Sequence, residues 1–127
     1  MPANSSRPFL RSPAPPSQTG SCIDACGTCA RVCLETLEEH CLPSEDHRAR
    51  VVQARLLLDC ATICRACADF LCRKSDHQAV ICLACAEICD ACAQACAESE
   101  DGAMRICEAT CSACAVLCRN LMAIERT

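Results

Sequence analysis

The stretch from Cys82 to Cys96 constrains the fold more than any other part of the chain. Its cysteines are separated by steps of three, four, three and four residues: Cys82, Cys85, Cys89, Cys92 and Cys96. Because an α-helix turns roughly 100° per residue, these steps place all the side chains within about 80° of arc. The intervening residues are mostly good helix formers and include no Gly or Pro. The spacing predicts a helix that carries a column of thiols along one face.

The same spacing recurs three more times in the chain. The further columns are Cys22, Cys26, Cys29 and Cys33, then Cys60, Cys64 and Cys67, and finally Cys107, Cys111, Cys114 and Cys118. Four helices are therefore expected, at about 22–42, 44–74, 75–98 and 103–123.

Capping and breaking residues separate the expected helices. Thr19 or Ser21 can cap the first helix and Pro43 ends it. Ser75 and Gln78 have the spacing of a capping box for the third helix. The second helix follows an acidic cap at 44–46, and the fourth follows a tight connection at 99–102.

Short connections force successive helices to run antiparallel, so the sequence predicts an all-α, up-down-up-down four-helix bundle with a cysteine-lined core. Folding the chain about these turns places Cys89 level with Cys111, with residue 61 on the second helix and with residue 26 on the first. The four thiol columns then overlap at one depth over roughly 20 Å.

A few residues fit the columns less well. By helical geometry Cys41 and Cys72 point roughly 100–120° away from their columns. His40 lies on the first column, but a lone histidine at a helix end more often caps the helix or is solvated than binds metal. Met104, one turn before Cys107, is expected at the mouth of the bundle, where a thioether ligand for Cu(I) and ordinary core or surface packing are equally good interpretations. Gly27 lies inside the first helix, where a close approach between helices would explain it.

Sulfur must fill much of the core, because the 52% apolar content includes 18 cysteines and the aromatic residues are two phenylalanines. Residues 1–20 are rich in Pro and Ser and are expected to form a disordered tail. The bundle is expected to occupy residues 21–127.

The rest of the composition excludes several classes of protein. The net charge is −4 and basic residues are scattered, so nucleic-acid binding has no support. We find no export signal and no apolar run long enough for a membrane helix, and expect a cytoplasmic protein. Thiols stay reduced in that compartment, and side chains one helical turn apart suit disulfides poorly. The cysteines are therefore expected to serve metal or redox chemistry.

Cu(I) fits this pattern best, because it is soft, favours thiolate and accepts two or three ligands. Bridging thiolates would let many ions bind per chain, and one monovalent cation per thiolate would keep the interior near neutral. An iron–sulfur or redox electron carrier and a zinc-binding sink protein are the alternatives. No catalytic constellation emerges, so the chain is expected to bind metal rather than to act as an enzyme.

The candidate metal ligands are the cysteines together with one methionine and one histidine: Cys22, Cys26, Cys29, Cys33, Cys41, Cys60, Cys64, Cys67, Cys72, Cys82, Cys85, Cys89, Cys92, Cys96, Cys107, Cys111, Cys114, Cys118, Met104 and His40.

The segments CLACAEICDACAQAC at 82–96 and CEATCSACAVLC at 107–118 resemble the bacterial copper storage proteins, and the resemblance covers about residues 21–123. It implies a homotetramer of four-helix bundles that stores many Cu(I) ions on inward cysteines. Because we find no export signal, the chain resembles the cytosolic branch of that family. A copper chaperone is a candidate partner. Cytosolic relatives carry histidines around the start of the last helix, where this chain has ESEDGAMRIC (98–107) and no histidine. Cu(I) is then expected to pass Met104, His40 or acidic side chains such as Asp46 and Glu100.

Overall fold

The computed structural model describes residues 17–126, except for the side chains of residues 47, 49, 125 and 126. The tail expected at 1–20 lies outside this range up to residue 16, whereas residues 18–20 already belong to the first helix. Five elements follow one another in the chain: α2 (Gln18–Thr36), a π-helical turn η1 (Leu37–Cys41), α3 (His47–Cys72), α4 (Gln78–Ala97) and α5 (Gly102–Arg126).

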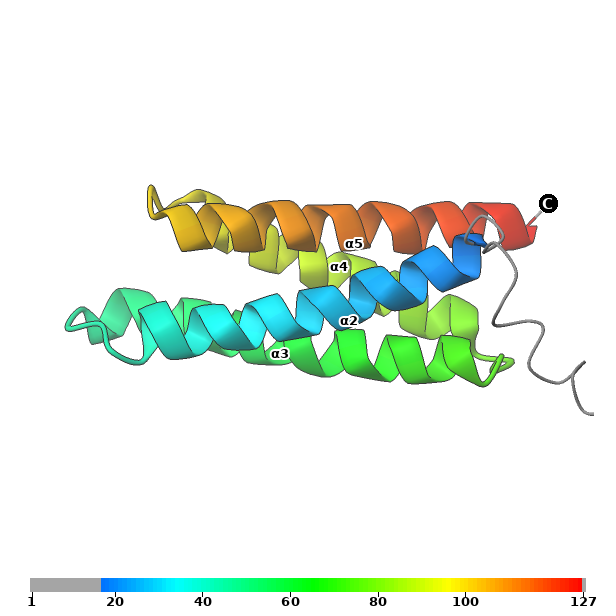
Figure 1. Cartoon of the computed structure of the whole chain (residues 1–127), viewed down its shortest axis with the longest axis horizontal. Helices are drawn as coiled ribbons and strands as arrows, with labels where there is room; N and C mark the ends of the chain where they lie inside the picture. Colours follow the sequence, from blue (N-terminus) through cyan, green and yellow to red (C-terminus); the bar gives the residue numbers. More distant parts are fainter. Residues whose placement is uncertain (1–16, 127) are drawn as a thin grey trace, which may run out of the picture.

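The helices form an antiparallel bundle, which confirms the predicted fold class (Figure 1). α2 packs against α3 and α5, and α4 packs against the same two helices, so α2 and α4 are diagonal to each other. The connection between α2 and α3 projects beyond the turn between α4 and α5 at the same end of the bundle (Figure 1). The expected overhang of the first two helices, where His40 and Cys41 lie, is therefore present.

Two predicted helix caps are wrong. Ser17, rather than Thr19 or Ser21, caps α2, and its Oγ accepts a hydrogen bond from the Gly20 N–H at 2.9 Å. Ser75 forms no capping box, because its Oγ accepts a hydrogen bond from the His77 N–H at 3.0 Å and α4 has no side-chain cap. The chain reverses just before it, at Lys74, with a positive φ of 53°. The Ser75 N–H donates back to the Phe70 carbonyl at 3.0 Å and so closes the end of α3. α4 then begins only at Gln78.

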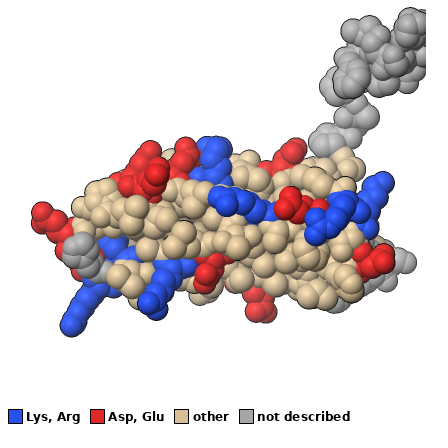
Figure 2. All heavy atoms as spheres, turned by 90° about the horizontal axis from the view of Figure 1, so that it is seen from below, with Lys and Arg blue, Asp and Glu red and all other residues tan. Residues whose placement is uncertain are grey.

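Cysteine forms most of the core. All the cysteines lie within the described residues, and each is buried except Cys72. Leu57, Leu71 and Met104 are the largest fully buried side chains in the described part of the chain. Acidic and basic side chains are scattered over the face that Figure 2 shows, as the sequence predicts. The bundle is therefore held together by small sulfur-containing side chains and few large ones.

α4 and the part of α5 from Gly102 to Ile124 are long and apolar enough, by length and composition alone, to cross a membrane. This differs from the expectation that no apolar run reaches that length, and it arises because both helices are rich in cysteine and alanine. Every cysteine of both helices is buried against the rest of the bundle. Helices in the core of a bundle pass the same test, so this finding is weak support for a membrane location.

Gly27 does not mark a close approach between helices, contrary to expectation. It is exposed on α2, and a methyl group there would meet no atom of another helix within 4 Å. Gly27 therefore lowers the stability of the helix through its conformational entropy, and no close packing compensates for this loss.

We predict that Gly27→Ala raises the free energy of unfolding by about 1 kcal/mol, because alanine favours the helix and nothing crowds it. Gly20→Ala is the matched control, since its methyl group would lie 3.1 Å from the capping oxygen of Ser17. The control should gain less or lose stability. Chemical denaturation of both variants without metal, under reducing conditions, measures the difference, and a destabilised Gly27→Ala would contradict the prediction.

Candidate metal centre

The thiols of α2 and α5 form a ladder along the bundle. Cys22 lies 3.6 Å from Cys118, and Cys26 lies 3.7 Å from Cys114, as sulfur–sulfur distances. The next rungs are Cys29 with Cys111 at 3.6 Å and Cys33 with Cys107 at 3.9 Å. Each step of three or four residues along α2 is matched by an equal step backwards along α5. The antiparallel register therefore brings every thiol of one column opposite a thiol of the other.

α3 and α4 form a second ladder by the same rule. Its rungs are Cys60 with Cys89 at 3.6 Å, Cys64 with Cys85 at 3.7 Å and Cys67 with Cys82 at 3.7 Å. Diagonal contacts tighten it, for example between Cys64 and Cys89 at 3.6 Å.

Cys60 joins the two ladders at the centre of the bundle. Its sulfur lies 3.7 Å from that of Cys29 and 3.8 Å from that of Cys111. The predicted register placed Cys89 level with residues 61 and 111, which agrees with these contacts to within one residue. On the first helix the contact falls at Cys29, one turn from the predicted residue 26. The four columns therefore face one another across one shared interior.

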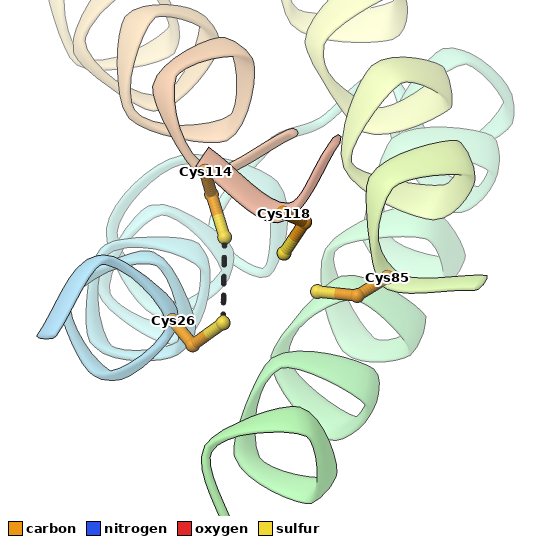
Figure 3. Close-up of side chains that lie close together, drawn as sticks. All are labelled: Cys26, Cys85, Cys114 and Cys118. Carbon is orange, nitrogen blue, oxygen red and sulfur yellow. Dashed lines mark hydrogen bonds between the residues drawn. The ribbon is translucent and has the colours of Figure 1, made fainter. Parts of the chain in front are cut away.

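Within the described residues, five groups of thiols have all their sulfur atoms within 4.8 Å of one another. The groups are Cys67, Cys82 and Cys118; Cys26, Cys85, Cys114 and Cys118; Cys29, Cys64, Cys89 and Cys114; Cys29, Cys33, Cys60 and Cys111; and Cys33, Cys92, Cys107 and Cys111. Figure 3 shows the second group, whose sulfurs converge from α2, α4 and α5.

These groups are linked because successive groups share cysteines. Cys118 belongs to the first and second groups, Cys114 to the second and third, and Cys29 to the third and fourth. Cys33 and Cys111 both belong to the fourth and fifth groups. We call this continuous set the thiol array. A soft cation held in one group would therefore share a ligand with the next.

The protonation states of neighbouring thiols depend on one another. The pKa of Cys60 is lowered, first by a hydrogen bond from Cys111 and then by one from Cys29, because these groups stabilise a thiolate. The pKa of Cys111 is raised, chiefly by its bond to Cys107, because a donor thiol keeps its proton. Adjacent thiols therefore cannot all ionise unless cations replace the protons.

The π-helical turn at Leu37–Cys41 changes which side chain continues the first column. In a regular α-helix, His40 would lie two turns after Cys33 and on the same face. A π turn holds about one residue more than an α turn. The extra residue puts Cys41 there instead, and the Cys41 side chain is 5% exposed. The expectation that Cys41 points away from its column is therefore wrong.

The same turn moves His40 off the column. Its Nδ1 lies 3.2 Å from Oδ2 of Asp101, in the connection before α5, and the pair is half-buried. In the described part of the chain His40 belongs to none of the five thiol groups.

The remaining candidates lie at the edges of the thiol array. Cys72 is exposed on α3, as its helical angle predicts. Met104 is fully buried one turn before Cys107 and is not exposed at the mouth. Cys96 is buried too, and its pKa is raised, first by a hydrogen bond with Cys107 and then by one with Cys92.

Sequence reasoning missed Arg50, which lines a cavity of about 270 Å³ together with Cys41. Burial raises the pKa of the Cys41 thiol, and the charge of Arg50 partly opposes that effect. Gln53 accepts a hydrogen bond from Arg50 Nη1 at 2.6 Å and donates one to the Ala95 carbonyl at 3.3 Å. No sequence signal points to Arg50, because its role depends on the π turn that brings Cys41 inward.

We predict that one thiol of the metal-free, reduced protein reacts with an aromatic disulfide reagent at least about tenfold faster than the thiols of the array, because access limits the reaction, while Cys41 in its cavity reacts at an intermediate rate. Cys72→Ser should abolish this fast phase. Cys26→Ser, which removes a buried thiol, should leave it unchanged. Counting the released chromophore against time measures the phase, and a fast phase of several thiols would contradict the burial of the array.

A model for the copper storage protein family matches residues 16–123 of this chain. A search of curated proteins finds no match. Among solved structures, the Nmul_A1745 protein from Nitrosospira multiformis is 40% identical, with a TM-score of 0.76, and the match covers 84% of this chain and 96% of that one.

Two further structures are copper storage proteins with bound copper. The Cu(I)-bound BsCsp3, a Csp3 of Bacillus subtilis, is 28% identical, with a TM-score of 0.78 and coverage of 84% of this chain and 99% of that one. A cytosolic copper storage protein from Streptomyces lividans with five coppers is 28% identical, with a TM-score of 0.79 and coverage of 84% and 92%.

Proposed function

This chain belongs to the copper storage protein family, and we propose that it stores Cu(I) in the cytosol on the thiolates that line its bundle. The observation that carries the proposal is the connected thiol array, in which successive groups share cysteines. Shared thiolates suit a cation that tolerates low coordination numbers and bridging ligands. Ions can then move along the array by exchanging one thiolate for the next.

The geometry disfavours an iron–sulfur carrier. Sulfurs such as those of Cys60 and Cys89 are already in contact at 3.6 Å. An iron–sulfur cluster places its own iron and sulfide atoms between the cysteine ligands. The array has no room for such a cluster without separating the helices.

Zinc is less suited to the interior than Cu(I) because of charge. A closed zinc site with four thiolates carries a net charge of −2. Among the described residues, Thr36 is the single polar or charged residue that is buried, and it is neutral. Its hydroxyl donates a hydrogen bond to the Val32 carbonyl at 2.7 Å. No cationic side chain among those the structure describes is buried in the core to balance a row of such sites, whereas one Cu(I) per thiolate leaves the core neutral.

We assign the ligands to the inward-facing cysteines: Cys22, Cys26, Cys29, Cys33, Cys41, Cys60, Cys64, Cys67, Cys82, Cys85, Cys89, Cys92, Cys96, Cys107, Cys111, Cys114 and Cys118. Cys72 is left out because it is exposed. Met104 stays a candidate thioether ligand beside Cys107, whereas His40 is already paired with Asp101.

The cytosolic location is supported by the Streptomyces lividans relative, which is described as cytosolic. We also propose a homotetramer, the assembly that the family resemblance implies, and exposed apolar side chains such as Val52, Val80 and Ile106 are available for contacts between copies. A copper chaperone would act as donor or acceptor. The family is one of storage proteins, which fits binding without turnover.

We predict that anaerobic titration with Cu(I) gives near-ultraviolet charge-transfer absorbance that rises until more than about ten equivalents are bound per chain. The chain has no Trp or Tyr, so this band is easy to follow. Zinc should not compete at equal concentration. A break at two or three equivalents, or a purified protein with visible iron–sulfur bands, would contradict the storage function.

Loading should release protons, because burial raises the pKa of thiols such as Cys41, and neutral thiols must lose their protons to bind Cu(I). A raised pKa keeps the proton on at neutral pH, so acidification opposes binding. We expect apparent affinity to fall by up to about tenfold per pH unit for each proton displaced. Competition with a Cu(I) chelator at several pH values measures this, and an affinity independent of pH would contradict it.

A further inference from the structure

We propose that Cys41 is the transfer thiol through which Cu(I), delivered as an anionic complex with small-molecule thiols, passes from the surface into the thiol array. This inference rests on the proposed Cu(I) storage function. Its basis is the position of Cys41, which lines a surface cavity and is buried in the same core as the thiol array.

The cavity gives a small carrier access to Cys41. It is lined by Cys41, Leu42, Arg50, Val51 and Ala54, and its volume is about 270 Å³. The Cys41 side chain is almost fully buried, so the cavity is its route to solvent. Its walls, three apolar side chains and Arg50 around a single thiol, suit a small thiol-bearing molecule.

On the inner side, Cys41 is buried in the same core as the cysteines of the thiol array. Cys107 and Cys92 act on it electrostatically, since negative charge on either would raise the pKa of Cys41. Both belong to the same thiol group as Cys33 and Cys111. We therefore assign Cys107 on α5 and Cys92 on α4 as the next ligands of an ion held by Cys41.

The π turn is what gives Cys41 this position. A continuous α-helix would direct His40 inward and Cys41 outward, because His40 lies two α turns after Cys33. The pair between His40 and Asp101 ties the turn to the connection before α5. π turns are uncommon and are often found at functional sites, in keeping with a role for this one.

Arg50 sets the charge of the carrier that the cavity accepts. Arg50 lines the cavity, and its guanidinium is oriented by Gln53, which is anchored to the Ala95 carbonyl on α4. A Cu(I) ion bound by two thiolates carries a net charge of −1. A fixed cation beside the receiving thiol attracts such a complex and repels a cationic one.

The transfer is a ligand exchange without oxidation or reduction. The Cys41 thiol binds the Cu(I) ion of the complex, and its proton goes to the first carrier thiolate, which leaves as a neutral thiol. A second exchange replaces the other carrier thiolate with Cys107 or Cys92, and the proton of that cysteine leaves with it. Copper remains Cu(I), and two carrier thiols are released per ion.

The test is the anaerobic rate of uptake from the Cu(I) bis-glutathione complex, followed by stopped-flow charge-transfer absorbance. Cys41→Ser should slow uptake by at least about tenfold, because a hydroxyl is a poor ligand for Cu(I), while capacity falls by about one ion. Cys72→Ser is the matched control, since Cys72 lines a different cavity with Leu71 and Lys74. This control should keep the rate of the unmodified protein.

Arg50→Gln tests the charge while it leaves every thiol in place. It should slow uptake from bis-glutathione Cu(I) by about two- to fivefold and should not slow uptake from the tetrakis(acetonitrile) Cu(I) cation. Circular dichroism checks that each variant is folded. If Cys41→Ser does not fold, the result for Arg50→Gln decides the question.

The outcomes separate the two proposals. If the unmodified protein binds only two or three ions, the storage function fails. If it binds many ions and Cys41→Ser takes them up at the normal rate, or if Cys72→Ser is the slow variant, the transfer role of Cys41 is wrong. If Arg50→Gln slows Cu(I) uptake equally from both donors, the inference that the carrier is anionic is wrong.

Discussion

The match between helical periodicity and antiparallel register is the constraint on which this structure depends. Steps of three and four keep each thiol column on one face of its helix. Equal steps taken backwards on the neighbouring helix bring the columns into contact rung by rung, from Cys22 with Cys118 to Cys33 with Cys107. A shift of one residue in either helix would break every rung of that ladder. The spacing of the cysteines therefore determines the packing and the chemistry together.

A core of thiols is stable in the metal-free state for reasons that also make it a good store. Cysteine packs as a small apolar side chain, and its S–H group is a weak donor that tolerates loose geometry. Contacts of 3.6 to 4.0 Å between sulfurs cost little to open. The core of this bundle can thus admit ions between side chains without breaking strong hydrogen bonds, which a core of buried amides or carboxylates could not do.

Much of the fold and of the array could be predicted from the sequence, because both follow from one repeated period. The helices, their antiparallel order and the level of Cys60 beside Cys89 all come from counting residues. The sequence did not predict the π turn, because the residues of Leu37–Cys41 suit an α-helix equally well. That one extra residue reverses the expected directions of His40 and Cys41. The capping box at Ser75 failed for a similar local reason, since its Oγ accepts a hydrogen bond from the His77 N–H and its own N–H ends the preceding helix.

Sharing of thiols between groups makes capacity a property of the whole array. If the groups were separate four-thiol sites, each would hold one ion and the number of groups would set the limit. Because Cys114 and Cys29 each belong to two groups, an ion in one group takes a ligand that its neighbour would use. Filling the array therefore requires thiolates to bridge ions, with fewer ligands for each ion. The charge of the interior also favours bridging, since an apolar interior is most stable with one monovalent cation per ionised thiol. The number of buried thiols thus sets the scale of the capacity.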